Sequence, residues 1–253
     1  MSLPKTSLRQ EGVLTLLRER TSASIAEMAH AFSVSEMTVR RDLERLVETG
    51  HVIRTPGGAR LARSLSFEKT FAERLQRMAS AKERIGRAAA ALVKEGESVV
   101  LDSGTTTLCI ARAMRGHRNI VVVTLSLPVV EELGGEESIR LELTGGVYRR
   151  SSHDLTGAAV SEALAGVRAD KVFFGAAALS FEYGVMVYDP EAPRALLSAA
   201  AERILVVDSG KIGQEALYRY AGLEACDCVI TDPGVLPEHL ARLRKQTKVV
   251  IAE

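Results

Sequence analysis

No apolar run in this chain of 253 residues approaches the roughly 18 residues that a membrane-spanning helix needs. Residues 1–10 also lack the apolar stretch of a secretory signal peptide, so we expect a cytoplasmic protein with no membrane partner. The only close cysteine pair, Cys226 and Cys228, has no second pair to complete a zinc site. Together with Cys109, it predicts small buried thiols in a reducing compartment, with no metal and no other cofactor.

An excess of one charge is also missing, because 33 Lys+Arg and 32 Asp+Glu leave a net charge of +1. The charge is unevenly placed, however: residues 1–87 carry a net +6 and residues 88–253 a net −5. A basic N-terminal part fits contact with nucleic-acid phosphates. The length admits two domains, and 46% hydrophobic and 26% charged residues are ordinary for a globular protein.

The N-terminal part has the element order of a winged helix-turn-helix. An apolar face (Val13, Leu14, Leu17) predicts a first helix over residues 8–20. Ser24 and Glu27 have the spacing of a capping box, which predicts that a second helix starts there. The apolar stripe of this second helix is Ile25, Met28, Ala29 and Phe32. After a turn at residues 33–35, the inward face of a third helix is Val39, Leu43, Leu46 and Val47, and Gly50 ends it.

The outer face of this third helix is basic, which is typical of a recognition helix in the major groove of DNA. We expect Thr38 and Arg41 to read base edges, because the first turns of such a helix reach the bases. Residues 51–54 and 59–61 predict a hairpin, or wing, across the tip Thr55-Pro-Gly-Gly58. The residues that we predict to contact double-stranded DNA are Ser35, Met37, Thr38, Arg40, Arg41, Arg45, Arg54 and Arg60.

Two further helical patterns follow, over residues 66–79 (Phe67, Phe71, Leu75, Met78) and over residues 81–93 (Ile85, Ala89, Leu92). They predict a helical linker over residues 63–94, between a DNA-binding domain over residues 1–62 and an α/β domain over residues 95–253. The patterns leave open whether the linker packs on the next domain, on a second subunit or within one chain. Operators with two-fold symmetry favour a homo-oligomer, a dimer or a tetramer.

From residue 97 onward, short β-rich runs alternate with helical stretches. The predicted strands are Ser98–Leu101, Ile120–Thr124, Ile139–Leu143, Lys171–Phe174, Ile204–Val207, Cys228–Thr231 and Val249–Ile251. The predicted helices are Thr107–Met114, Leu127–Leu133, Ser161–Ala165, Ala192–Glu202 and Pro237–Lys245. This alternation predicts a mainly parallel α/β domain with helices on both faces of the sheet. Ligands of such sheets bind beyond the carboxyl ends of the strands.

Three such strand ends carry candidate ligand residues. The segment Asp102-Ser-Gly-Thr-Thr-Thr107 joins a strand to a helix, where backbone N–H groups and hydroxyls suit an anion such as phosphate. No Walker lysine follows, which argues against a nucleoside triphosphate. Asp208 and Lys211 suit a polyhydroxy anion or a plain surface ion pair. After Gly145 and Gly146, Arg149 and Arg150 either meet an anion or solvate a loop, and the loop is the favoured interpretation.

These residues resemble the DeoR family of transcriptional regulators over nearly the whole chain. The most specific match is Val34-Ser-Glu-Met-Thr-Val-Arg-Arg-Asp-Leu43, followed by Gly50, Arg54 and Gly57-Gly58-Ala59. The later matches are Leu101-Asp-Ser-Gly-Thr-Thr-Thr107, Thr144-Gly-Gly146, Asp170-Lys171, Phe173-Phe-Gly-Ala176, Asp208-x-x-Lys211 and Ile230-Thr-Asp232.

The resemblance implies a repressor with a non-catalytic sensor domain similar to ribose-5-phosphate isomerase, and a phosphorylated sugar or related metabolite as effector. On this basis residues 103–107 hold the phosphate, while Asp102 and Lys211 line the pocket. The full set of expected ligand residues is Asp102, Ser103, Gly104, Thr105, Thr106, Thr107, Gly145, Gly146 and Lys211.

The chain departs from the family pattern at Leu125, Ala177, Ala178 and Arg194, where the family usually has an asparagine, an aspartate, a glycine and a lysine. The phosphate loop is thus better preserved than the groups that read sugar hydroxyls. We expect an anionic effector that is less hydroxylated or differently shaped, or a domain that has lost effector binding. Two alternatives remain: a working sugar-phosphate isomerase with a regulatory head, and a DNA-binding architectural protein with an inert domain.

Overall fold

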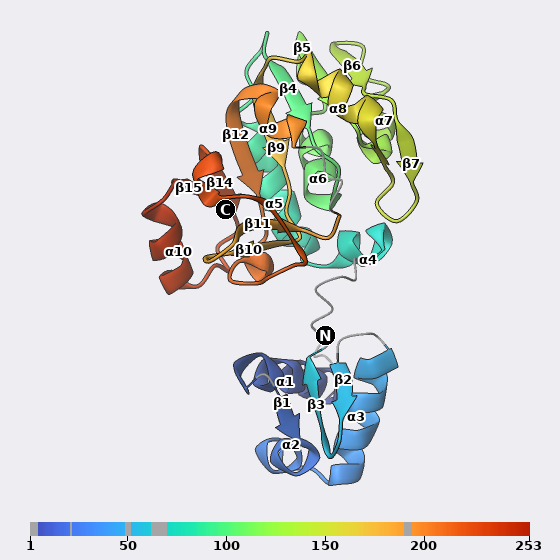
Figure 1. The fold of residues 1–253 in the computed structure, drawn as a ribbon, viewed down its shortest axis with the longest axis vertical. Helices are drawn as coiled ribbons and strands as arrows, with labels where there is room; N and C mark the ends of the chain where they lie inside the picture. Colours follow the sequence, from blue (N-terminus) through green and yellow to red (C-terminus); the bar gives the residue numbers. More distant parts are fainter. Residues whose placement is uncertain (1–4, 21, 49–51, 62–69, 190–193) are drawn as a thin grey trace. The chain divides into compact units, whose positions relative to one another are not determined.

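The computed structural model describes residues 5–20, 22–48, 52–61, 70–189 and 194–253 (Figure 1). The chain divides into two compact units, Met1–Ser64 and Leu65–Glu253. The predicted helix end at Gly50, the first residue of the wing, His51, and the linker residue Phe67 lie outside the described residues.

The first unit is a winged helix-turn-helix, as the sequence predicts. It consists of α1 (Lys5–Arg20), β1 (Ser22–Ser24), α2 (Ile25–Ala31), α3 (Glu36–Glu48), β2 (Val52–Thr55) and β3 (Gly58–Leu61). The strands form an antiparallel sheet in the order β1-β3-β2, and the hairpin of β2 and β3 is the predicted wing. The third strand, β1, is an element that the sequence did not predict.

The core of this unit confirms most of the predicted apolar faces. Val13, Leu17, Met28, Val39 and Leu43 are each at most 1% exposed. The capping box of Ser24 and Glu27 is present at the start of α2.

One predicted inward residue is wrong, because Val47 is 39% exposed. It lies one residue before the end of α3, where the helix extends past the packed side chains.

The second unit contains a seven-stranded sheet that is parallel throughout and confirms the predicted class. Its strands are β4 (Ser98–Leu101), β5 (Ile120–Thr124), β6 (Ile139–Leu143), β9 (Ala169–Phe174), β12 (Ala200–Val206), β14 (Cys228–Thr231) and β15 (Lys248–Ile251). Their order is β15-β14-β12-β9-β4-β5-β6. The chain therefore reverses its direction of travel across the sheet between β4 and β9. Such a switch point is where open α/β sheets bind ligands.

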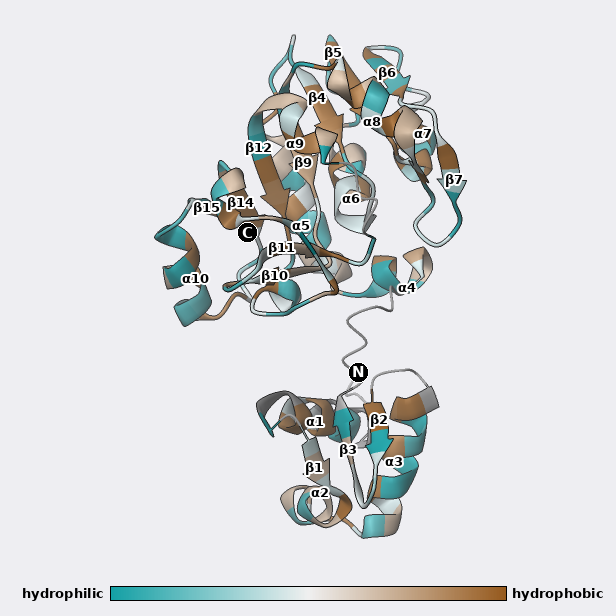
Figure 2. Ribbon diagram, viewed as in Figure 1, coloured by the Kyte–Doolittle hydropathy of each residue, from teal (hydrophilic) through white to brown (hydrophobic). Residues whose placement is uncertain are grey.

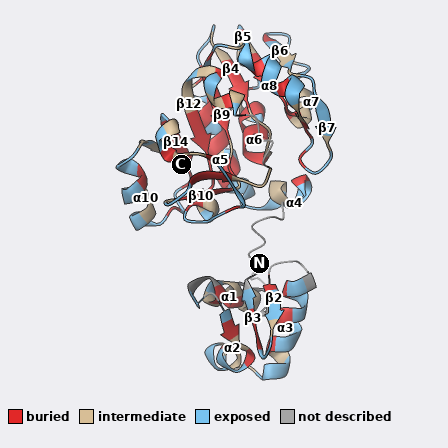
Figure 3. Ribbon diagram, in the orientation of Figure 1, coloured by how far each residue is buried: buried red, intermediate tan, exposed pale blue. Residues whose placement is uncertain are grey.

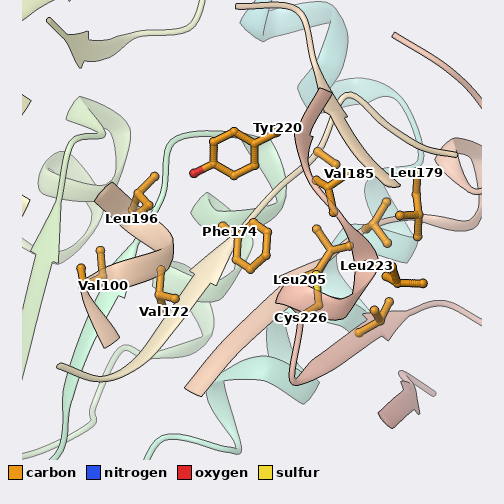
Figure 4. Close-up of a cluster of buried hydrophobic side chains, with 14 of the residues drawn as sticks. Val100, Val172, Phe174, Leu179, Val185, Leu196, Leu205, Tyr220, Leu223 and Cys226 are labelled. Atoms are coloured by element: carbon orange, nitrogen blue, oxygen red, sulfur yellow. The ribbon is translucent and has the colours of Figure 1, made fainter. Parts of the chain in front are cut away.

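Helices cover both faces of the sheet (Figures 1 and 2). One face packs on α5 (Ala79–Ala90), α6 (Thr105–Ala113) and α7 (Leu127–Leu133). The other packs on α8 (Ala158–Ala165), α9 (Ala195–Ser198) and α10 (Pro237–Arg244). The strands alternate between the two cores, since Phe173 belongs to the first and Phe174 to the second. Figure 3 shows the central strands buried, and Figure 4 shows Phe174 beside Tyr220 in the second core.

Several small elements above the strand ends were not predicted. They include a hairpin of β7 (Val147–Arg149) with β8 (Asp154–Thr156) and a sheet of β10 (Ala178–Ser180), β11 (Gly184–Val187) and β13 (Tyr218–Ala221). Two short 3₁₀ turns, η1 (Ser209–Lys211) and η2 (Leu223–Ala225), complete the unit.

Two predicted helices differ from the structure. Of the segment Ala192–Glu202, only Ala195–Ser198 is described as helix, and β12 begins at Ala200, which pairs with Ala169 of β9. The alanine-rich run satisfies a helical pattern, but pairing with the sheet determines its end. The pattern over residues 66–79 is likewise interrupted, because α4 (Phe71–Gln76) ends before Met78. Met78 has a left-handed conformation (φ +54°), which a continuous helix excludes.

Candidate DNA-binding surface and anion site

The outer face of α3 presents the predicted DNA-contacting side chains to solvent. Met37 is 62% exposed, and Arg40, Arg41 and Arg45 are exposed as well. Ser35 caps the helix, since its Oγ accepts a hydrogen bond from the Thr38 backbone N–H at 3.3 Å. The inward side of the same helix is the core of the unit, so these side chains face solvent while the helix stays packed.

The wing arginines differ from each other. Arg60 is exposed on β3, whereas Arg54 pairs with Glu44 of α3 at 3.0 Å and donates a hydrogen bond to the Arg40 carbonyl oxygen at 3.5 Å. Part of the charge of Arg54 is thus compensated within the unit. Arg40 has a longer contact, 3.7 Å, with Glu36 one turn away.

Sequence reasoning missed Asp42, which fixes α3 on the first helix. Asp42 is 3% exposed and accepts hydrogen bonds from the Arg9 Nε at 2.5 Å and from the Gln10 amide at 3.4 Å. The hydrogen bond with Asp42 raises the pKa of Arg9. The feature of the sequence that could have revealed Asp42 is its position as a carboxylate in a basic helix, directly after Arg40 and Arg41.

In the second unit, Asp102 links the two strand ends at the switch point. It follows β4, and its carboxylate accepts hydrogen bonds from the backbone N–H of Gly175, after β9, at 3.1 Å and of Ser103 at 2.7 Å. Burial raises the pKa of Asp102 to about 7 against the effect of these two hydrogen bonds, and nearby Asp154 raises it further. This carboxyl group therefore carries only part of its charge at neutral pH.

The N-terminus of α6 forms the floor of this site. Gly104 precedes it with φ +140°, and no described side chain caps the helix. The hydroxyl of Thr107 donates to the Gly104 carbonyl oxygen at 2.9 Å, and Thr105, Thr106 and Thr107 are at most 4% exposed. The first turn therefore offers backbone N–H groups to an anion, and a helix N-terminus favours negative charge.

A buried ion pair stands beside the same loop. Asp154, at the start of β8, is fully buried and accepts a hydrogen bond from the Ser103 hydroxyl at 2.6 Å. Arg149 holds the Asp154 carboxylate in a fork, with Nη2–Oδ2 at 2.7 Å and Nε–Oδ1 at 3.0 Å, and also pairs with Asp189. Burial works to raise the pKa of Asp154, but the hydrogen bonds from Arg149, Ser103 and Ser152 hold it below its usual value.

The favoured interpretation of Arg149 as a solvating loop residue is therefore wrong. Its partner Asp154 lies five residues later on the paired strand of the hairpin, opposite it in the register. Nothing in the linear spacing indicated that hairpin, so neither Asp154 nor Asp189 was singled out.

Lys211 and Asp208 lie on the other side of the switch point. The Lys211 ammonium donates to the Ala176 carbonyl oxygen at 2.6 Å, next to the end of β9. Asp208 is 2% exposed, and its Oδ1 has no hydrogen-bond partner within the described part of the chain. Its burial is inconsistent with a surface ion pair. Burial and the charge of Lys211 lower the pKa of Lys82, a third buried group here, to about 8.

The next loop contains the other two predicted ligand residues, Gly145 and Gly146, and their role stays a prediction. Gly145 and Gly146 connect β6 to β7, and between described residues no hydrogen bond joins them to residues 102–107. A Cβ at Gly146 would lie 2.7 Å from the Thr156 carbonyl oxygen and 2.9 Å from a Val160 methyl group. This glycine accordingly permits close packing of the β6–β7 loop on β8 and α8.

The positions that depart from the family pattern have apolar or outward environments. Leu125 is 1% exposed within a core cluster, and Ala178 is also buried. The exposed Arg194 donates to the carbonyl oxygen of Arg219 at 3.4 Å, on β13. Leu125 therefore supplies no amide group, whereas Arg194 keeps the positive charge of the lysine in the family pattern.

Comparison with known proteins gives two family matches. Residues 9–64 match the DeoR-like helix-turn-helix domain, and residues 77–233 match the DeoR C terminal sensor domain. The chain is 33% identical to the putative aga operon transcriptional repressor of Escherichia coli O157:H7, over 97% of this chain and 93% of that protein. It is 30% identical to the glycerol-3-phosphate regulon repressor of Escherichia coli K12, over 90% and 91%.

Similar solved structures overlap more loosely. Ribose 5-phosphate isomerase A from Methanocaldococcus jannaschii is 16% identical, with a TM-score of 0.39 over 53% of this chain and 55% of that one. The full-length sorbitol operon regulator SorC from Klebsiella pneumoniae is 10% identical, with a TM-score of 0.42 over 96% and 100%. Overlaps this loose have no bearing on the ligand.

Among the described residues, none of the helices combines the length and apolarity that a bilayer crossing requires. The two matched domains account for most of both units, and they pair a DNA-binding module with a sensor module rather than with an enzyme. The chain belongs to the DeoR family of helix-turn-helix transcriptional regulators.

Proposed function

We propose that this protein represses transcription at a specific operator and that a phosphorylated sugar or related anionic metabolite controls its hold on DNA. Several relatives are named repressors, among them the lactose phosphotransferase system repressor of Lactococcus lactis, which is 32% identical over 97% of this chain. The predicted residues of α3 and of the wing contact the DNA. The proposed effector site consists of Asp102, Ser103, Gly104, Thr105, Thr106, Thr107, Gly145, Gly146 and Lys211.

The observation that carries the effector site is the uncapped N-terminus of α6 at the switch point of the sheet. Its first backbone N–H groups lie beside Gly104, whose φ of +140° only glycine adopts readily. A Cβ at Gly104 would meet nothing closer than the Thr107 Oγ1 at 3.7 Å. The glycine is therefore required by the backbone conformation of the loop and not by crowding, as expected of a loop that approaches an anion.

Control of DNA binding by an effector requires two conformational states of the protein that bind the effector with different affinity. Shifting a population from 1:99 to 99:1 takes about 5.5 kcal/mol of differential binding. The protein works as a homo-oligomer, a dimer or a tetramer, and the effector changes the spacing of two winged-helix units. Residues 63–94 connect these units to the sensor, and within that segment α5 packs on the sheet and on α6.

A proline substitution tests the backbone N–H groups of the anion site. Thr105→Pro deletes the first backbone N–H of α6 at the helix position where proline is tolerated. The matched control is Ala158→Pro, because α8 also starts after a glycine and has no side-chain cap. We expect Thr105→Pro to weaken binding of a phosphorylated sugar about tenfold, the value of one charge-assisted hydrogen bond, and the control to bind normally.

Titration calorimetry with inorganic phosphate and a panel of triose, pentose and hexose phosphates gives the affinities. Equal affinity of the two proline variants for every compound would place the anion elsewhere. Tight binding of an ordinary pentose or hexose phosphate would contradict the altered, less hydroxylated effector that Leu125 and Ala177 suggest.

A further inference from the structure

The short helix α4 makes an aromatic contact at its N-terminal end with the turn between β7 and β8. Phe71, its first residue, is 8% exposed, and its ring lies 5.3 Å from the ring of His153, at a tilt of 48°. The guanidinium of Arg74 covers the Phe71 ring at 5.7 Å. Figure 1 shows α4 near the lower end of the hairpin that contains β7. In the second unit, α4 is the first described element after residues 62–69, so it is the described element of that unit nearest in sequence to the DNA-binding unit.

His153 is itself held by the backbone of the hairpin. It has φ +57°, a left-handed conformation, and its N–H donates to the Arg149 carbonyl oxygen at 2.9 Å. Its own carbonyl oxygen accepts a hydrogen bond from the N–H of Leu127, at the start of α7, at 3.2 Å. These two bonds fix the backbone of His153, while its side chain is exposed and meets the rings of Phe71 and Tyr148.

The residue after His153 reaches the proposed effector site. Asp154 accepts the only hydroxyl proton of Ser103 at 2.6 Å, and Ser103 belongs to the loop before α6. Ser103, Asp154, His153 and Phe71 form a continuous chain of contacts from that loop to α4. The chain consists of one hydrogen bond, one peptide link and one ring contact.

The C-terminal end of α4 is fixed on the opposite side of the site. Lys82 of α5 is 2% exposed and donates to the carbonyl oxygens of Arg74 and Arg77, the second at 2.6 Å. These are carbonyls that a helix end leaves without partners of its own. With one end of α4 anchored in this way, a change at Phe71 turns the helix rather than shifting it as a whole.

We propose that His153 is a positioning residue that carries effector binding from Ser103 to α4 through its contact with Phe71. The inference rests on the proposed function. An anion at the N-terminus of α6 competes with Asp154 for the Ser103 hydroxyl proton. Once the Ser103 hydroxyl donates its hydrogen bond to the anion instead, Asp154 still accepts hydrogen bonds from Arg149 and Ser152. It no longer has a hydrogen bond to the Ser103 hydroxyl. The turn at His153 then relaxes, and the aromatic contact with Phe71 changes with it.

Two substitutions at position 153 separate the ring from the turn. Asparagine tolerates the left-handed conformation that His153 adopts, so His153→Asn keeps the turn and removes the ring contact. His153→Phe keeps a ring of similar size against Phe71. Tyr148→Phe is the matched control, because it removes only the 3.4 Å contact between the Tyr148 hydroxyl and the His153 Nδ1.

The experiment uses the full chain, the tightest-binding sugar phosphate of the panel, and a duplex selected from random sequence by the unmodified protein. Amide exchange of residues 71–77 and DNA affinity are measured with and without the sugar phosphate. We expect the unmodified protein, His153→Phe and Tyr148→Phe to lose DNA affinity and to change exchange in α4 when it binds. His153→Asn should bind it within threefold of the unmodified protein but show at least a fivefold smaller change in DNA affinity.

Three results would overturn the inference. The first is a full response of the His153→Asn variant in both α4 exchange and DNA affinity. The second is an equal loss of response in the asparagine and phenylalanine variants, which would make His153 a structural residue. The third is an unmodified protein that binds no sugar phosphate or keeps its DNA affinity when it does. In that case the proposed function fails first, and the inference fails with it.

Discussion

The carboxylate of Asp102 accepts a hydrogen bond from the backbone N–H of Gly175 at 3.1 Å and so joins the ends of β4 and β9. These two strands are neighbours in the sheet, yet 67 residues separate the end of one from the start of the other. The bond closes the switch point from above, next to the first turn of α6. It also places a carboxyl group with a raised pKa where a negatively charged ligand is expected, so the proton of Asp102 bears on both stability and binding.

Stability should fall as the pH rises toward neutrality. The pKa of Asp102 is raised from 3.8 to about 7 in the folded chain. Below pH 3.8 the group is protonated in both states and has no effect. Between pH 3.8 and 7 the unfolded chain loses the proton first, and the free energy of unfolding decreases. Above pH 7 the full penalty is present. We expect a decrease of roughly 2 kcal/mol between pH 5 and 8, because one pKa unit corresponds to about 1.4 kcal/mol.

Asp102→Asn should remove this dependence, since asparagine does not titrate. Denaturant unfolding at pH 5, 6, 7 and 8 measures the free energy of unfolding. Asp170→Asn is the control, because hydrogen bonds from Ser98 lower the pKa of this exposed aspartate. Its contribution is present above pH 3.8 and disappears only in acid, so the control should follow the unmodified protein between pH 5 and 8. Parallel curves for all three proteins would contradict the assignment to Asp102.

The ion pair of Asp154 and Arg149 should matter much more for stability than a surface pair. Asp154→Ala leaves a partly buried guanidinium short of a carboxylate and two hydroxyls without their acceptor, and we expect a loss of about 3 kcal/mol. Asp227→Ala is the matched control, because Arg203 and Asp227 form a similar fork, with contacts of 2.9 and 3.0 Å, that is more than a third exposed. Its loss should cost about 0.5 kcal/mol.

Thermal and denaturant unfolding of both alanine variants compare the two pairs directly. Equal destabilisation would mean that the hairpin of β7 and β8 is not fixed by this ion pair. The position of His153 would then need another explanation.

The sequence predicted the fold better than the site because the two depend on different ranges of interaction. Continuous apolar strands such as Val99-Val-Leu101 are local patterns, and a parallel sheet buries them on both faces. The contact between Ser103 and Asp154 spans 51 residues and depends on a hairpin that folds back over the strand ends. Its strands have three residues each, too few to show a period.

The same distinction explains one of the two segments where the prediction was wrong. An alanine-rich stretch before β12 has good helix propensity, but the ladder between Ala200 and Ala169 extends the strand into it. In the connector, a helical pattern continues through Met78, where the backbone turns instead. At Ala200 the pairing of strands overrides a local helix preference, whereas the structure gives no such contact for the exposed Met78.

The burial of the threonines at the proposed anion site leads to a prediction about their hydroxyls. Because Thr105, Thr106 and Thr107 are buried and the Thr107 hydroxyl already donates to Gly104, backbone groups should contribute most of the affinity. Thr106→Val keeps the shape and removes one hydroxyl. We expect it to change affinity for a phosphorylated sugar less than threefold by calorimetry, against about tenfold for Thr105→Pro. A larger loss for the valine variant than for the proline variant would assign the binding to the threonine side chains.

DNA recognition should separate two arginines of α3 that are both exposed. Arg41 lies near the start of the helix, where side chains reach base edges, and Arg41→Ala should relax discrimination at one base pair by about 1–3 kcal/mol. Arg45 lies a turn further on, and Arg45→Ala should weaken binding to all sequences and reduce the salt slope by about one. Arg140→Ala, in the second unit, removes an exposed arginine of β6 and serves as the control.

Fluorescence anisotropy with the selected duplex, its single-base variants and an unrelated duplex, at several salt concentrations, gives both quantities. Arg41→Ala should change the order of affinity among the duplexes, whereas Arg45→Ala should lower the affinity for all of them together. A uniform loss for Arg41→Ala would assign it to phosphate instead of a base. The recognition role would then pass to Thr38 and Met37, which lie on the first turn of α3. An altered salt slope for Arg140→Ala would instead show that the second unit also contacts DNA.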